Sequence, residues 1–216
     1  MSPYEEAYQK MLAFFGPQQW WPAKSPFEII VGAVLTQGTS WKNVEKALAN
    51  LEFAHLLNYD ALLALPEKAL AELIKPAGFF NVKAARLGNL LVMIAENYGG
   101  KIDALLADEL GQARQALLKV RGVGEETADA ILLYAAGKPI FVIDSYTHRI
   151  FSRHNMVDEE TDYQTMQKTF MANIEEEASI FNEYHALIVM TAKKFCKKNK
   201  PLCPNCPLYG LNECYI

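Results

Sequence analysis

Four cysteines near the end of the chain are the side chains whose type and spacing most clearly could do chemistry. Cys196, Cys203, Cys206 and Cys214 are separated by six, two and seven residues, and the 195 residues before Cys196 contain no cysteine. Clustered thiols in a chain that is not expected to be secreted are typical of metal ligands rather than of disulfides. They could hold an iron–sulfur cluster or a tetrahedral Zn²⁺. Structural zinc commonly uses two Cys-x2-Cys pairs and this tail has one, so the spacing favours a cluster.

A Gly-x-Gly turn, made of Gly122, Val123 and Gly124, joins two helical stretches within residues 115 to 151. Two glycines that flank one apolar residue can take backbone angles closed to other residues, so N–H groups can point out of the turn. The adjacent helix N-terminus carries partial positive charge, which suits a phosphate. The turn therefore indicates a site that binds the phosphate backbone of a nucleic acid whatever its base sequence. An ordinary turn between two helices would show the same residues.

Asp144 is a lone carboxylate between the apolar residues Phe141, Val142 and Ile143 and the stretch SYTHRIFSR, which is expected to be a helix. An aspartate in this place commonly caps the helix N-terminus. A short Gly/Pro loop connects it to the Gly-x-Gly turn, so its carboxylate could also face a nucleic acid bound at that turn. The two roles are compatible.

Lysines and tryptophans supply two further groups that could contact a nucleic acid. The run KKFCKKNK at residues 193 to 200 nominates Lys197, Lys198 and Lys200 as phosphate contacts, with a solvated helix end as the alternative. Trp20, Trp21 and Trp41 could be ordinary core aromatics. They could equally stack on a base turned out of the duplex, and would attract it more strongly if that base were positively charged.

The elements that must position these residues are predicted to be helices throughout. Residues 1 to 24 open with apolar residues at helical spacing and break at Gly16, whereas Ser25, Pro26 and Glu28 are typical of a helix start. A second helix is capped by Thr39 or Ser40. Further helices are expected near residues 53–64, 66–75, 81–98, 102–108, 110–120, 144–153, 160–175 and 177–195. No stretch sustains the period-two alternation of a strand, so the sequence predicts an all-α fold.

Length, composition and charge narrow the class of protein. The 216 residues are about half apolar and contain no uninterrupted apolar run long enough for a transmembrane helix. The N-terminus lacks the pattern of a secretory signal, so a cytoplasmic, bacterial-type intracellular protein without a membrane partner is expected. A net charge of −4 is not that of a bulk nucleic-acid binder, so a local basic surface would be required. Nothing indicates oligomerisation, and a monomer is the default expectation.

Taken together, these residues resemble the endonuclease III superfamily of DNA glycosylases, in which a helix-hairpin-helix is followed by a Gly/Pro-rich loop and an aspartate. VRGVGEETADAIL resembles the hairpin, GKPIFVIDSYTHRI the loop and catalytic aspartate, and the four-cysteine tail the [4Fe-4S] loop. The resemblance runs from roughly residue 25 to the C-terminus. It implies that Asp144 is catalytic and that Gln37 and Phe79 lie in turns that fill the gap left by an extruded base.

Two departures from the family pattern bear on the activity and the cofactor. Bifunctional members carry a lysine two residues beyond the second hairpin glycine, as the nucleophile that forms an imine and leads to strand cleavage. Here that position is Glu126, 18 residues before Asp144, which is the family's interval. A carboxylate cannot form the imine, so the usual lyase route is missing. The tail also has seven residues between its last two cysteines, where family members typically have five.

The segments Trp20-Trp21-Pro22 and LTQGTSWKNVEKA look most like a bacterial branch of the family that removes 3-methyladenine. The resemblance implies a monofunctional DNA N-glycosylase of base excision repair. It would flip alkylated purines out of double-stranded DNA and hydrolyse their N-glycosidic bond. Two alternatives stay open: a bifunctional glycosylase and AP lyase of the endonuclease III type acting on oxidised pyrimidines, and a non-catalytic, cluster-bearing DNA-binding module.

The expected architecture is two helical lobes. Residues 25–136 would form a six-helix lobe that contains the hairpin. Residues 1–24 together with 137–216 would form a second lobe that carries the cluster tail. Bound DNA would lie between the lobes, with Asp144 at their junction.

Overall fold

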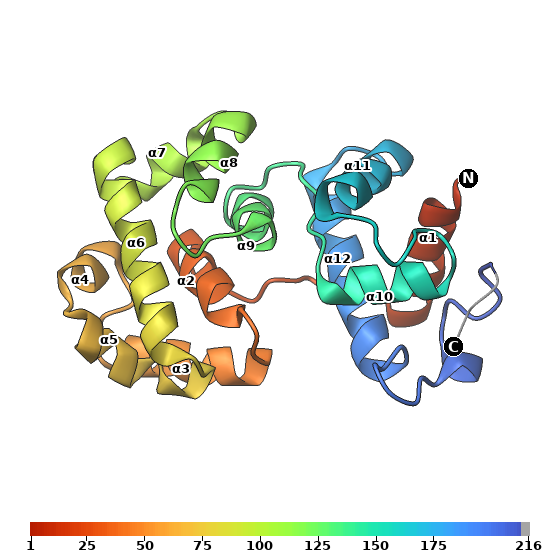
Figure 1. Ribbon diagram of the computed structural model, residues 1–216, viewed down its shortest axis with the longest axis horizontal. Coiled ribbons are helices and arrows are strands. Elements are labelled where there is room, and N and C mark those ends of the chain that lie inside the picture. The colour runs from red at the N-terminus through yellow and green to blue at the C-terminus, as the bar shows by residue number, and fades with distance from the viewer. Residues whose placement is uncertain (213–216) are drawn as a thin grey trace. The chain divides into compact units, whose positions relative to one another are not determined.

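The computed structural model describes residues 1–212 and is helical, with no β-strand among these residues (Figure 1). The all-α prediction is confirmed. The chain divides into two compact units, which we call the terminal unit, Met1–Pro22 with Pro139–Ile216, and the central unit, Ala23–Lys138. Within the described range, no helix combines the length and apolar character needed to cross a membrane.

The central unit is a bundle of short helices around the longest helix of the unit, α6. Its eight α-helices exceed the six expected for this lobe, and several of them, such as α4 and α7, have only six residues. The elements of this unit are α2 (Pro26–Thr36), α3 (Trp41–Phe53), α4 (Tyr59–Ala64), α5 (Glu67–Leu73), the 3₁₀ turn η1 (Lys75–Ala77), α6 (Phe80–Tyr98), α7 (Ile102–Ala107), α8 (Leu110–Leu118), α9 (Glu125–Ala130) and the π-helical turn η2 (Ile131–Ala135).

Capping residues explain where the helices of the central unit begin. Ser25 Oγ accepts the backbone N–H of Glu28 at 3.2 Å, as predicted for the start of α2. The Glu28 carboxylate accepts the backbone N–H of Lys24 at 3.0 Å, one residue before the cap. Ser40 occupies the cap position of α3 without a side-chain cap bond. The helix predicted at residues 53–64 begins only at Tyr59, because Asn58 caps α4 there.

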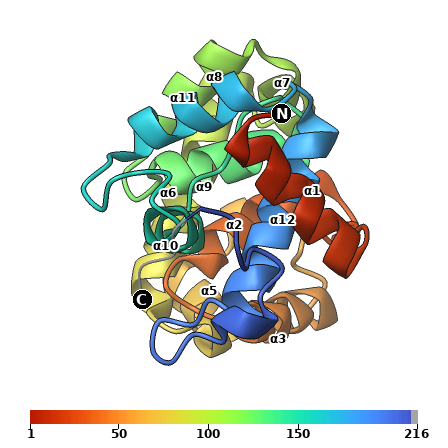
Figure 2. The ribbon, with the colours of Figure 1, turned by 90° about the vertical axis from the view of Figure 1, so that its right-hand side faces the viewer.

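The terminal unit brings the N-terminal helix α1 (Pro3–Phe15) against α12 (Ala178–Lys194) and α11 (Tyr163–Asn173) (Figure 2). Its remaining elements are α10 (Ser145–Arg153) and the 3₁₀ turn η3 (Cys203–Asn205). Aromatic rings fill the core. Phe141 stacks on Phe170 with ring centroids 4.5 Å apart, and the Tyr4 and Phe151 rings are parallel at 5.7 Å.

This aromatic core also fixes the segment that carries Asp144. Residues Ile140 to Ile143 are buried and form no strand, as the sequence predicts. Gln167 Nε2 donates to the Phe141 carbonyl at 2.6 Å, which ties the segment to α11. Burial of these four consecutive apolar residues therefore fixes the chain just before Asp144, the N-cap of α10.

Candidate functional site

Asp144 occupies the N-cap position of α10, and both of its carboxylate oxygens lie close to polar side chains. Oδ1 accepts the backbone N–H of Thr147 at 2.7 Å and the Thr147 hydroxyl at 2.8 Å. Oδ2 lies 3.7 Å from Nε2 of His185 on α12. The Asp144 side chain is only 11% exposed. The predicted capping role is confirmed, and the carboxylate still has a route to solvent.

The environment of Asp144 keeps its carboxylate ionised. Burial is the largest single influence and raises the pKa, but the interactions with His185 and with Thr147 together outweigh it. The pKa of Asp144 therefore lies below its ordinary value of 3.8. A negative charge held at low exposure interacts strongly with positive charge that develops nearby, because little water screens it.

His185 is a site residue that the sequence does not indicate. It lies in the middle of α12, among residues that are buried on both sides of it, and a lone histidine in an apolar helix is most often part of the core. Only the packing of α10 on α12 brings its ring to Asp144. No local sequence signal would have indicated this.

The two glycines of the Gly-x-Gly turn differ in what they require. Gly122 has φ +98°, which L side chains rarely adopt, and a Cβ built there would lie 2.3 Å from Cγ of Arg86. Gly124 has φ −96° and ψ −179°, which any residue adopts, and a Cβ there would meet nothing within 4 Å. Both glycines could take special backbone angles, and of the two Gly122 does so whereas Gly124 does not. Val123 is buried at 6% exposure and anchors the turn.

Gln37 and Phe79, the two residues expected in DNA-inserting turns, differ in their hydrogen bonding and in their exposure to solvent. The Gln37 amide nitrogen donates to the Gly122 carbonyl at 3.0 Å and to the Thr127 hydroxyl at 2.9 Å. Its amide oxygen accepts from Arg86 Nη1 at 2.6 Å. Phe79, in left-handed conformation at the N-cap of α6, is 74% exposed. Glu126 is exposed in the first turn of α9.

Trp20 and Trp21 belong to the terminal unit and Trp41 to the central unit. Trp20 and Trp21, in the terminal unit, are half-buried, with ring centroids 6.4 Å apart at an angle of 65°. Nζ of Lys193 lies 5.8 Å from the centre of the Trp20 ring. Trp41, also half-buried, is the first residue of α3 in the central unit.

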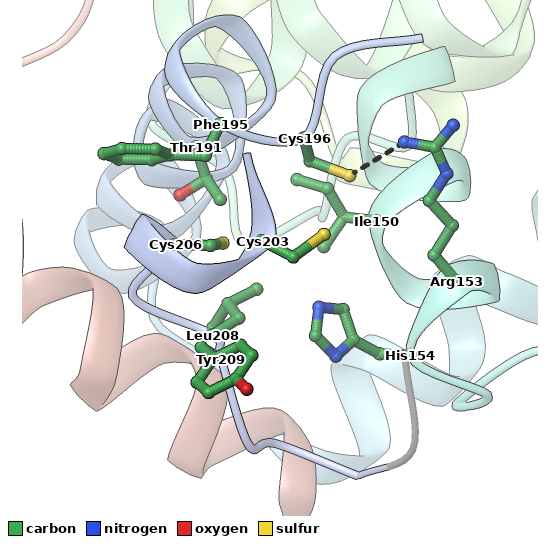
Figure 3. Close-up of a pocket in the computed structure, with 10 residues that line it drawn as sticks. All are labelled: Ile150, Arg153, His154, Thr191, Phe195, Cys196, Cys203, Cys206, Leu208 and Tyr209. Carbon is green, nitrogen blue, oxygen red and sulfur yellow. Dashed lines mark hydrogen bonds between the residues drawn. The ribbon is translucent and has the colours of Figure 1, made fainter. Parts of the chain in front are cut away.

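Three of the four cysteines line one small cavity of about 20 Å³ in the terminal unit (Figure 3). Cys196 is buried and its Sγ lies 3.4 Å from Nη1 of Arg153, whereas Cys203 and Cys206 are half-buried. Within residues 1–212, no three His, Cys, Asp or Glu side chains are placed to hold a metal ion. Cys214 lies outside the described residues, so the predicted set of four ligands is described only in part.

The lysine segment, residues 197 to 200, follows Cys196 and is held by an arginine from α10. Arg153 donates to the Lys197 carbonyl at 2.8 Å and to the Lys198 carbonyl at 2.9 Å. Arg149 Nε donates to the Cys196 carbonyl at 2.9 Å. Lys197, Lys198 and Lys200 are all exposed. The segment therefore has an anchored backbone and solvated ammonium groups, which suits contact with phosphates.

The hairpin, the Gly/Pro loop and the capped aspartate can be compared with known proteins. The model of the HhH-GPD superfamily of base excision DNA repair proteins matches residues 31–176 of this chain. The chain belongs to the HhH-GPD superfamily. It is a DNA glycosylase of base excision repair with an endonuclease III-like helix-hairpin-helix fold, and its partner is DNA.

Two curated relatives cover most of the chain. A Methanocaldococcus jannaschii protein, provisionally named as the DNA repair glycosylase MJ1434, is 48% identical over 93% of this chain and 91% of its own length. Endonuclease III of Thermotoga maritima is 30% identical over 88% of this chain and 84% of its own length.

Solved structures show the same fold. The Helicobacter pylori 3-methyladenine DNA glycosylase MagIII, bound to 1,N6-ethenoadenine, is 30% identical with a TM-score of 0.76, over 90% of this chain and 98% of that one. A non-covalent complex of endonuclease III with DNA has a TM-score of 0.82 at 23% identity, over 98% of this chain and 95% of that one.

Proposed function

We propose that this glycosylase removes alkylated purines of the 3-methyladenine type from double-stranded DNA and leaves the strand intact. The observation that carries the proposal is the pair of residues Asp144 and Glu126. The aspartate is kept and ionised, while the position that holds the lyase lysine in bifunctional members holds an exposed carboxylate. The likeness to MagIII, a 3-methyladenine DNA glycosylase, supports the substrate class.

Asp144 would supply the catalysis through its charge. Loss of the base leaves positive charge on the deoxyribose, and a nearly buried carboxylate stabilises that charge in the transition state. The same carboxylate would orient a water molecule for attack on C1′. Because 3-methylation already weakens the glycosidic bond, the enzyme would need little acid catalysis at the base.

The DNA would be held by the hairpin and opened by two side chains. The amides of Gly122 and Gly124 would contact the backbone phosphates around the lesion, whereas the Val123 N–H already donates to the Val120 carbonyl at 3.0 Å. Gln37 and Phe79 would occupy the gap left by the flipped base, and the 74% exposure of Phe79 supports this for the phenyl ring. Lys197, Lys198 and Lys200 would add phosphate contacts.

Trp20, Trp21 and Trp41 would hold the extruded base. A 3-methylated adenine nucleotide is positively charged, and each good contact of a cation with an aromatic face contributes about 0.5 to 2 kcal/mol. Lys193 already lies near the Trp20 ring, so this ring can accept a cation on its face.

We also propose that Cys196, Cys203, Cys206 and Cys214 hold a [4Fe-4S] cluster. The chemistry of these side chains fits such a cluster, because three thiols line one cavity and Arg153 can offset negative charge at Cys196. When bound, the cluster would cross-link the tail to the end of α12 and so order the lysine segment. Iron, sulfide and zinc analysis of purified protein would distinguish the cluster from the zinc alternative.

The proposed function is tested with two labelled duplexes, one that carries 3-methyladenine and one that carries thymine glycol. Each is analysed for base release and for strand breaks before and after alkali. Release of 3-methyladenine with breaks that appear only after alkali is the expected result. Direct nicking at thymine glycol would overturn both the substrate class and the absence of lyase activity.

A bifunctional activity of the endonuclease III type is the second candidate, favoured by the 30% identity to Thermotoga maritima endonuclease III. Borohydride trapping discriminates the two, since only an imine intermediate becomes covalently fixed to DNA. Tight binding of both duplexes without base release would instead favour a non-catalytic DNA-binding module.

A further inference from the structure

A fully buried lysine connects the two turns from which DNA-inserting side chains are proposed to emerge. Lys83, on the first turn of α6, is 1% exposed, and its Nζ donates to the Leu35 carbonyl at 2.8 Å and to the Ala77 carbonyl at 2.7 Å. Leu35 lies two residues before Gln37, and Ala77 lies two residues before Phe79. One ammonium group therefore anchors the backbone just ahead of both residues.

The backbone of the same lysine adds a third link. Its N–H donates to the Phe79 carbonyl at 3.0 Å, which fixes Phe79 at the N-cap of α6. Burial, and secondarily the charge of Arg86, lowers the pKa of Lys83 to about 8. A lysine is seldom buried so completely unless its ammonium is hydrogen-bonded, and here two of its three N–H groups donate to carbonyls.

Arg86, one helical turn further along α6, completes the connection to the hairpin. Its Nη1 donates to Gln37 Oε1 at 2.6 Å, while its aliphatic stem lies where a side chain on Gly122 would have to go. Gln37 in turn donates to the Gly122 carbonyl and to the Thr127 hydroxyl. Arg86, Gln37 and Gly122 thus form a closed ring of contacts.

We propose that Lys83 and Arg86 are positioning residues that make the Gln37 turn, the Phe79 turn and the hairpin a single preorganised element for opening DNA. The inference rests on the proposed roles of Gln37 and Phe79. Neither lysine nor arginine would touch the reacting sugar. Both act through other residues, because an inserted side chain opens a duplex efficiently only when its backbone is already fixed.

The test uses a duplex that carries a tetrahydrofuran abasic analogue opposite 2-aminopurine, whose fluorescence rises when it is unstacked. This duplex offers a gap without requiring base release, so its result is independent of the lesion that the enzyme removes. Lys83→Met and Arg86→Met keep the aliphatic bulk of each side chain while they remove its hydrogen bonds. Arg86→Lys restores a cation, and Lys101→Met removes an exposed charge elsewhere in the central unit.

The proposal predicts that, at saturating protein, Lys83→Met loses at least three-quarters of the wild-type fluorescence rise and Arg86→Met about half. Arg86→Lys should recover part of the loss, and Lys101→Met should match the wild type. A wild-type fluorescence rise in folded Arg86→Met or Lys83→Met would overturn the proposal. If Lys83→Met does not fold, Arg86→Met decides the question, because Arg86 is only half-buried.

Gln37→Ala and Phe79→Ala are also made singly in the wild-type protein. If neither changes the fluorescence rise, the proposed insertion of these side chains is wrong, and so is the positioning role that rests on it. If those two variants lose the signal and Arg86→Met keeps it, only the positioning role is wrong. The two failures are therefore distinguishable.

Discussion

At the scale of single residues, the activity depends on what surrounds Asp144 and on what stands at position 126. Thr147 donates two hydrogen bonds to Asp144, and His185 lies nearby. Together they keep the aspartate charged although its side chain is only 11% exposed. Position 126 is exposed at the start of α9, so a change there should affect chemistry rather than folding.

Glu126→Lys should create the imine chemistry that the wild type lacks. If position 126 faces the sugar of a bound abasic product, an amine there can attack C1′. We expect a covalent complex with abasic DNA after borohydride reduction for Glu126→Lys, and none for wild type or for the Glu126→Gln control. A variant that still releases bases but gives no trapped complex would show that position 126 does not face the sugar.

Thr147→Val removes one hydrogen bond to a charged oxygen and keeps the backbone N–H bond. We expect the free energy of unfolding at pH 7 to fall by about 1 to 3 kcal/mol. The pKa of Asp144 in the wild type lies below 3.8, so its charge contributes stability above that pH, and this contribution is lost as the pH falls through the folded-state value.

The variant should raise that pKa, so the stability gap between wild type and Thr147→Val should narrow as the pH falls through the folded-state pKa of the variant towards that of the wild type. Thermal melts from pH 7 to pH 3 measure the gap. A gap that stays constant over the whole range would mean that the hydroxyl does not act through the charge of Asp144.

At the scale of elements, the hairpin offers a matched pair of glycines. Gly122→Ala must accommodate a positive φ and a Cβ only 2.3 Å from Arg86 Cγ, so we expect a loss of about 1 to 3 kcal/mol in unfolding free energy. Gly124→Ala meets no neighbour within 4 Å and has an ordinary φ, so its stability should stay within about 1 kcal/mol of the wild type. Denaturant unfolding tests the contrast, and equal losses in the two variants would contradict it.

The elements show which sequence signals predict structure well. Ser25 and Asp144 were predicted as caps and make the expected bonds, because capping depends on residues within one turn. The start of α4 was misplaced because an Asn58 cap lies inside an apolar stretch that looks continuous. Gly124 takes an ordinary backbone angle, because a glycine permits an unusual angle without requiring it.

At the scale of the whole molecule, the order of hairpin, aspartate and cysteine tail was enough to predict the family, because each motif is short and local. The contacts between distant segments were not predictable. Lys83 contacts the carbonyl of a residue 48 positions earlier, and His185 reaches Asp144 only through the packing of α12 on α10. A lysine or histidine in an apolar helix gives no sign of its partner.

The net charge of −4 makes DNA binding depend on local basic groups. Replacing the three exposed lysines of the lysine segment by alanine should weaken binding to every duplex alike. It should also reduce the slope of log K against log salt concentration by about 2 to 3, since each phosphate contact contributes about 0.9. The variant changes Lys197, Lys198 and Lys200.

A control variant removes three exposed lysines of the central unit, Lys46, Lys68 and Lys101. Titrations of one abasic-analogue duplex at several salt concentrations give both slopes. If the slope changes equally in the two variants, the lysine segment contributes to DNA binding only through its net charge.

The most direct test of the account is the rate of base release by Asp144→Asn under single-turnover conditions, with binding to the abasic-analogue duplex measured alongside. Asparagine caps a helix about as well as aspartate, so α10 should be kept while the charge is lost. We expect the rate to fall by roughly 10²-fold or more with binding within a few-fold of wild type. A near-normal rate would contradict the assignment of Asp144 as the charge that drives base removal.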